Sequence, residues 1–198
     1  MKILLVGASG TLGRAVHQAL SHHQVITAGR GSGDLRVDIT DSASVQQMFE
    51  QAGRLDAIVS ATGSVRFAPL AEMTAADFRI GLNDKLLGQI DLALTGQHYL
   101  NDGGSITLTS GIISAQPIRQ GSNATAVNRA LEGFAAAAAL ELGRDRRINV
   151  VSPNALQESW DGYAPFFPGF EPVPASRAAL AYVRSVEGIG NGQTLTVW

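Results

Sequence analysis

Residues 3–13 read Ile-Leu-Leu-Val-Gly-Ala-Ser-Gly-Thr-Leu-Gly, and this stretch decides the fold. The four apolar residues from Ile3 to Val6 are typical of a short buried strand. Glycines follow at positions 7, 10 and 13, and apolar residues then recur at helical spacing, which predicts a helix over residues 11–20. A strand, a glycine-rich turn and a helix in this order are typical of the first half of a βαβ unit.

The rest of the chain repeats this alternation of short apolar runs and helical patterns. We expect further strands over residues 25–28, 35–39, 57–60, 106–109, 148–151 and 194–197. The helical patterns cover residues 42–52, a stretch opened by Thr74, 82–100, 125–142 and 176–186, and Asn101 to Gly104 predict a turn. Strands separated by helices predict an α/β fold: one domain over residues 1–198, with a Rossmann-type, doubly wound parallel sheet of about seven strands and helices on both faces.

Composition excludes several classes of protein. Of 198 residues, 45% are hydrophobic and 16% charged, which provides enough apolar surface for a core and argues against disorder. The net charge of −2 does not favour a nucleic-acid or membrane-surface partner. The chain has no cysteine, and its four histidines lack metal-ligand spacing, so we expect no disulfide and no metal site. No apolar run has the length of a signal or membrane segment, so we expect a cytoplasmic protein.

The glycine turn points to a dinucleotide. Glycines let backbone N–H groups approach a pyrophosphate at a helix N-terminus, and the turn residues are Gly7, Ser9, Gly10, Thr11, Leu12 and Gly13. At the end of the second strand, Arg30 stands where an NAD site carries a carboxylate, and no acid precedes Asp34. The pattern therefore favours NADP. Asp38, which ends the third strand, is a candidate for a hydrogen bond to adenine. Each of these three features has an alternative interpretation: the glycine turn as a turn without ligand, Arg30 as a solvated turn arginine, and Asp38 as an ordinary Asp before a helix.

With these motifs the chain resembles the short-chain dehydrogenases/reductases over nearly its whole length. The segments that carry the resemblance are Gly7–Gly13, Ser60–Gly63, Lys85–Gly88, Ile106–Ser110, Asn128–Phe134, Ile148–Pro153 and Gly192–Val197. The resemblance implies that Ser110 is the catalytic serine. It also implies cofactor contacts from Ser60, Ala61, Thr62, Gly63, Pro153 and Leu156.

The catalytic pair of that family is missing here. Its tyrosine and lysine fall on Ala124 and Asn128, and neither residue can act as the general acid. Lys85 is our candidate substitute, because a lysine beside a cationic ring and away from water would have a lowered pKa. Tyr163 is an alternative donor, and a surface position for Lys85 stays open. We expect reduction of a small carbonyl or imine compound; the alternative is an inactive NADPH-binding sensor or regulatory protein.

Two further segments suggest partners. The helices over 82–100 and 125–142 lack a wholly polar face, which predicts a homodimer or homotetramer. Residues 157–175 are rich in aromatic side chains and proline, and the resemblance makes them a lid over a small-molecule substrate. Packing of these aromatic residues on the rest of the protein is the other reading.

Overall fold

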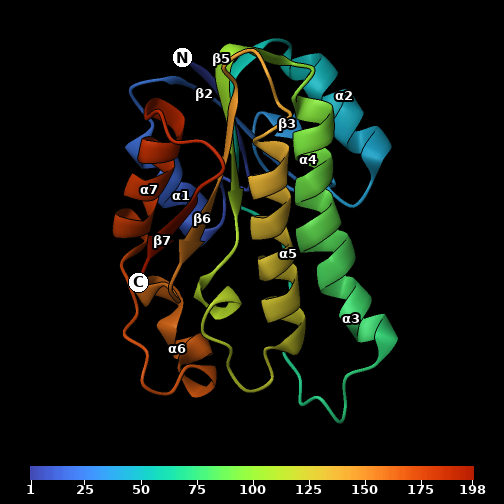
Figure 1. Cartoon of the computed structure of the whole chain (residues 1–198), viewed down its shortest axis with the longest axis vertical. Helices are drawn as coiled ribbons and strands as arrows, with labels where there is room; N and C mark the ends of the chain where they lie inside the picture. The colour runs from blue at the N-terminus through green and yellow to red at the C-terminus, as the bar shows by residue number, and fades with distance from the viewer.

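The computed structural model describes residues 1–198 and contains one seven-stranded parallel sheet (Figure 1). The strand order is β3-β2-β1-β4-β5-β6-β7. The strands are β1 (Lys2–Val6), β2 (Gln24–Gly29), β3 (Leu35–Arg36), β4 (Leu55–Ser60), β5 (Leu100–Thr109), β6 (Arg147–Pro153) and β7 (Thr194–Val197). The chain builds outward from β1 to β3 and then crosses to β4, so the order reverses between β1 and β4, where ligands bind in such sheets. The predicted fold class is confirmed.

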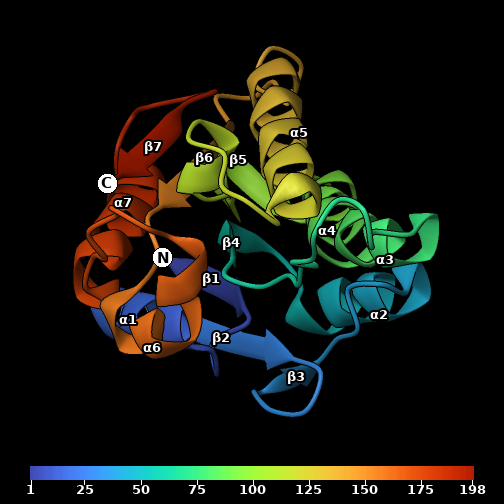
Figure 2. The same cartoon turned by 90° about the horizontal axis from the view of Figure 1, so that it is seen from below.

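Helices cover both faces of the sheet (Figure 2). One face carries α1 (Thr11–Ala19) and α7 (Ala175–Glu187), which pack on each other and on the inner strands. The other face carries α2 (Ser42–Ala52), α4 (Gly88–Gly96) and α5 (Ser122–Ala138). The strand residues Ile3 to Val6 are almost fully buried between these layers, as expected of a parallel strand with both faces covered.

The helix predicted over residues 82–100 is shorter in the structure and begins with a turn of a different helix type. The structure has α3 (Ala75–Gly81), a π-helical turn η1 (Leu82–Leu87) and then α4. Thr74 caps α3 as predicted, in a capping box with Asp77. The helical stretch ends at Gly96, because Leu100 already begins β5. The π turn is wider than an α turn, and it contains Lys85.

Two predictions about strands were wrong. The third strand ends at Arg36 rather than Ile39, because it pairs only with the last two residues of β2. The predicted turn over 101–104 lies inside β5. Gly103 takes a positive φ of 75°, and the β4–β5 register shifts between Leu55 and Ala57, so the glycines make an irregularity in the strand rather than a chain reversal.

The segment after β6 forms three short helical turns, η3 (Gln157–Ser159), α6 (Trp160–Tyr163) and η4 (Ala164–Phe166). In Figure 1 this segment lies at the end of the molecule opposite the N-terminus, beyond the carboxyl end of β6. None of the helices has the length and apolar character needed to cross a membrane.

Candidate functional site

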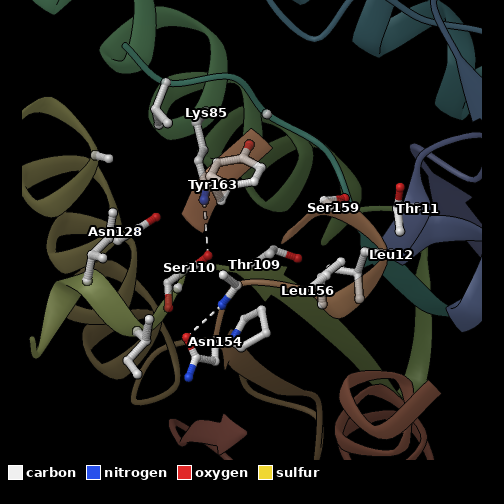
Figure 3. A pocket seen from close by; sticks show the side chains of 18 of the residues that line it. Thr11, Leu12, Lys85, Thr109, Ser110, Asn128, Asn154, Leu156, Ser159 and Tyr163 are labelled. Atoms are coloured by element: carbon white, nitrogen blue, oxygen red, sulfur yellow. Dashed lines mark hydrogen bonds between the residues drawn. The ribbon is translucent and has the colours of Figure 1, made fainter. Parts of the chain in front are cut away.

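A cavity of about 440 Å³ opens at the carboxyl ends of β1, β4, β5 and β6. It brings together most of the residues predicted from the sequence to form the site. These are Gly10, Thr11, Leu12, Ala61, Thr62, Gly63, Lys85, Ser110, Pro153 and Leu156. Figure 3 shows Thr11, Leu12 and Leu156 on one side of this cavity and Ser110 and Asn128 on the other.

A second cavity, of about 280 Å³, continues the first toward β2. Thr62 lines both cavities, so they adjoin at the turn after β4. Gly7, Ser9 and Arg30 line this second part. Together the two cavities form a cleft across the point where the strand order reverses.

The glycine turn is closely packed, which explains its composition. Gly7 has φ of 90°, and a Cβ there would lie 2.6 Å from the carbonyl oxygen of Ala61. A Cβ on Gly13 would lie 2.0 Å from the carbonyl oxygen of Gly7. Gly13 is therefore needed for packing between turn and helix, and it does not line either cavity.

Arg30 is 69% exposed in its side chain and lies between two carboxylates. Its guanidinium is 3.5 Å from Asp38 and 3.8 Å from Asp84. Asp38 also accepts hydrogen bonds from the backbone and hydroxyl of Thr40, which hold its pKa below the usual range, with a smaller contribution from Arg30. Asp38 does not line the cleft, and its contact with adenine stays a prediction.

Ser60 also lies outside the cavity wall. It is fully buried, and its carbonyl oxygen accepts a hydrogen bond from the Thr109 hydroxyl at 2.5 Å. Thr109 Oγ1 lies 2.6 Å from the hydroxyl oxygen of Tyr182. Burial raises the pKa of Tyr182 well above its usual value. This buried chain of hydrogen bonds joins β4, β5 and α7 beneath the site, and no local sequence pattern predicts it.

Lys85 reaches into the cavity from the π turn (Figure 3). Its Nζ donates a hydrogen bond to the backbone carbonyl oxygen of Ser110 at 3.0 Å. The stem of the lysine packs over Gly63, where a Cβ would lie 2.7 Å from Lys85 Cγ. No carboxylate pairs with the ammonium, and burial lowers the pKa of Lys85 to about 8.

The hydroxyl of Ser110 has a different partner. Ser110 Oγ donates to Oε1 of Glu132 on α5 at 2.9 Å, and the Ser114 hydroxyl donates to the same oxygen. Arg129 lies 3.4 Å from the other carboxylate oxygen. Glu132 was not among the site residues predicted from the sequence. The available signal was its position four residues after Asn128, because residues four apart lie on the same face of a helix.

Ala124 and Asn128 lie on this same face of α5 and line the cavity. Both are buried, and Asn128 Oδ1 has no hydrogen-bond partner. A buried carbonyl oxygen without a donor is costly, so it marks a place where a ligand hydroxyl or N–H group would be stabilised.

Aromatic side chains close the outer wall. Phe67 follows β4, and Tyr163 and Phe167 come from the predicted lid segment. The Phe67 ring lies 6.1 Å from Tyr163 and 5.3 Å from Phe166, centroid to centroid. The segment after β6 therefore packs on the loop after β4, and Tyr163 remains 40% exposed.

Comparison with known proteins identifies the family. Residues 9–192 match the family model described as enoyl-(acyl carrier protein) reductase. The chain is a short-chain dehydrogenase/reductase. This confirms the resemblance found in the sequence motifs.

Solved structures of similar proteins share the fold of this dehydrogenase/reductase. The crystal structure of the protein lin1944 from Listeria innocua is 53% identical, with a TM-score of 0.98 and complete coverage of both chains. A small-chain dehydrogenase in complex with NADPH is 25% identical, with a TM-score of 0.88, and the match covers 100% of this chain and 96% of the other.

Among curated proteins, hydroxynaphthalene reductase arp2 of Aspergillus fumigatus is 27% identical over 150 residues, or 71% of this chain and 55% of that protein. An uncharacterised oxidoreductase of Methylorubrum extorquens is 26% identical over 175 residues, covering 76% of this chain and 71% of its own. The chain spans about half the length of the hydroxynaphthalene reductases that it matches.

Proposed function

We propose that this protein is an NADP(H)-dependent oxidoreductase that reduces a small carbonyl or imine compound, with Lys85 as the proton donor. The observation that carries the proposal is the position of the Lys85 ammonium. It lies inside the cavity, 3.0 Å from the carbonyl oxygen of Ser110, the residue that follows β5. The family's tyrosine is replaced by Ala124, and Lys85 is the cavity residue with an exchangeable proton and a pKa near neutrality.

The residues of the cleft fit NADPH. Gly7 and Ser9 line the second part of the cleft beside the N-terminus of α1, which suits a pyrophosphate, and Arg30 provides a cation for a 2′-phosphate. The unpartnered Asn128 Oδ1 is suited to accept a hydrogen bond from a sugar hydroxyl. When bound, the cofactor would supply the hydride, and the similar dehydrogenase with NADPH supports the choice of cofactor.

Lys85 is suited to both halves of general acid–base chemistry. With a pKa of about 8, both its ammonium and its amine form are populated near neutral pH. In the reductive direction the ammonium donates its proton to the substrate oxygen or nitrogen, and the amine is reprotonated from solvent. The hydrogen bond to the Ser110 carbonyl fixes one N–H of the three, which leaves the others for substrate.

The cavity supports a small, partly apolar substrate. Its volume is about 440 Å³, and Phe67, Phe167 and Tyr163 form an apolar wall above Lys85. The segment 157–175, which carries two of these residues, would act as the lid. The name of a similar protein, a hydroxynaphthalene reductase, supports reduction of an aromatic compound.

The test is NADPH oxidation with a panel of ketones, aldehydes and imines, followed by absorbance. We expect turnover of at least one small carbonyl compound, and turnover at least about 100-fold slower when Lys85 is replaced by Met. Tight NADPH binding without turnover of any member would instead favour the NADPH-binding sensor, in which the lost tyrosine and lysine are not replaced.

A further inference from the structure

Glu132 fixes the direction of the Ser110 hydroxyl. Ser110 Oγ lies 2.9 Å from Glu132 Oε1 and is the donor in this hydrogen bond. A serine hydroxyl has one proton and two lone pairs, so this proton is not free for a ligand. Toward the cavity, which Ser110 lines, the hydroxyl can offer only a lone pair.

Burial and a second hydrogen bond restrain the side chain of Glu132. Its side chain is 11% exposed, and the Ser114 hydroxyl donates to the same oxygen as Ser110. Arg129 approaches the outer carboxylate oxygen at 3.4 Å. A free Ser110 hydroxyl could turn to donate to a substrate carbonyl; with Glu132 in place, that rotation would break a charge-assisted hydrogen bond.

The two polar groups at the end of β5 therefore have opposite character. The Lys85 ammonium is a donor, and its bond to the Ser110 carbonyl keeps it beside the same residue. The Ser110 hydroxyl is an acceptor. A substrate that satisfies both must carry an acceptor oxygen for Lys85 and, close to it, a hydroxyl or amino group for Ser110.

We infer that Glu132 is a positioning residue that makes the site select carbonyl compounds with a neighbouring hydroxyl or amino group, such as α-hydroxy ketones. This inference rests on the proposed function for its catalytic readout, and it also predicts binding. A plain ketone has no donor for Ser110, so the Ser110 lone pair would stay unsatisfied in a closed site. Sites built to pair a substrate hydroxyl reject analogues without it more strongly than apolar pockets reject a missing methylene.

The experiment compares a matched pair of probes, 2-hydroxyacetophenone and acetophenone. For the wild-type protein we expect kcat/KM to be at least about tenfold higher for the hydroxy ketone, the loss that one unmade hydrogen bond in a closed site causes. In Glu132→Met the Ser110 hydroxyl loses its acceptor and is free to turn and donate to a substrate carbonyl. The ratio of kcat/KM between the hydroxy ketone and the plain ketone should then fall to about threefold or less. Glu132→Gln keeps a carbonyl oxygen for the two serines and should retain the tenfold ratio.

Ser114→Ala is the matched control, because it removes the other hydroxyl on Glu132 and leaves the Ser110 bond in place. Its ratio should stay at the wild-type value. A wild-type ratio near one would overturn the inference without any variant. An undiminished ratio in folded Glu132→Met would also overturn it; if that variant does not fold, Glu132→Ala takes its place.

Binding separates this inference from the proposed function. If no member of the carbonyl and imine panel turns over, including these two probes, the proposed reaction fails. The dissociation constants of the two probes for the NADPH-loaded protein, measured by ligand-observed NMR, then test Glu132 alone. A tenfold preference for the hydroxy ketone that disappears in Glu132→Met supports the inference, and equal dissociation constants contradict it.

Discussion

At the glycine-turn end of the cleft, closely packed glycine backbone forms part of the wall beside side chains such as Arg30, whereas at the β5–α5 end the wall consists of side chains. A Cβ on Gly7 or Gly13 would collide with carbonyl oxygens of neighbouring turns, so the shape of the first end depends on residues that have no side chain. At the second end, the side chains of Ala124 and Asn128, where the resemblance predicts the loss of the family's tyrosine and lysine, line the cavity. A wall built by backbone admits few replacements, but a wall built by side chains can change its chemistry while the strands and helices stay in place.

Substitution of Gly13 should have the largest effect. In Gly13→Ala the new Cβ meets the Gly7 carbonyl oxygen at 2.0 Å, and only backbone movement can relieve that contact. We expect the affinity for NADPH to fall at least 100-fold and the free energy of unfolding to fall by about 1–3 kcal/mol. Fluorescence titration and thermal unfolding measure the two effects.

Gly10→Ala is the matched control for stability. Its Cβ would lie 3.6 Å from the nearest atom, an ordinary contact, so the unfolding midpoint should change little. If Gly13→Ala unfolds and binds NADPH like the wild-type protein, close packing of the glycine turn does not determine the shape of this end of the cleft.

Lys85→Met tests the chemistry of the β5–α5 end of the cleft. Loss of the proton donor should lower the turnover number by about 10²–10⁴-fold, the usual contribution of general acid catalysis. The dissociation constant for NADPH should stay within about twofold, because the glycine turn and Arg30 are untouched. Lys2→Met is the control: Lys2 is the only other lysine, its Nζ donates to the carbonyl oxygen of Ala52 at the end of α2, and it lines neither cavity.

Arg30→Ala tests whether side chains contribute at the backbone-built end. The guanidinium is 69% exposed and is shared with Asp38 and Asp84, so its contribution is smaller than that of a buried pair. We expect NADPH to bind about five- to tenfold more weakly and NADH to bind unchanged. Arg36→Ala, which removes a nearby exposed arginine, should change neither affinity; an equal loss for both cofactors in Arg30→Ala would rule out a contact with the 2′-phosphate.

Substitutions on the outer surface between α4 and α5 should change NADPH binding in the cleft least. Leu94 is 51% exposed and borders an apolar groove with Phe134 and Leu142, so we expect a homodimer or homotetramer to cover it. Leu94→Arg should reduce the assembly to monomers in light scattering, with NADPH affinity within about twofold. A wild-type monomer at micromolar concentration would contradict this prediction.

Local sequence patterns predicted the glycine turn and several helices and strands well. The helix over Ser42–Ala52 and the strand over Thr194–Val197 have the predicted bounds, and the glycine turn lies in the cleft. These features depend on periodicity and on backbone conformation, which short stretches of sequence encode.

The side-chain end was harder to predict because its contacts join distant parts of the chain. The bond from Ser110 to Glu132 spans 22 residues, and the bond from Lys85 to Ser110 spans 25. Periodicity places each residue on an element, but it does not say which hydroxyl meets which carboxylate. The π turn around Lys85 was also missed, since its residues have the pattern of an ordinary helix.

The pH dependence of single-turnover NADPH oxidation tests the role of Lys85 most directly. Reduction needs the ammonium form, and burial lowers the pKa of Lys85 to about 8, so the protonated fraction and the rate should fall together as pH rises through that value. We predict a falling limb with a midpoint near pH 8 in the wild-type protein and no such limb in the residual rate of Lys85→Met. A rate that does not change across this range in the wild-type protein, or the same limb in Lys85→Met, would contradict proton donation by Lys85.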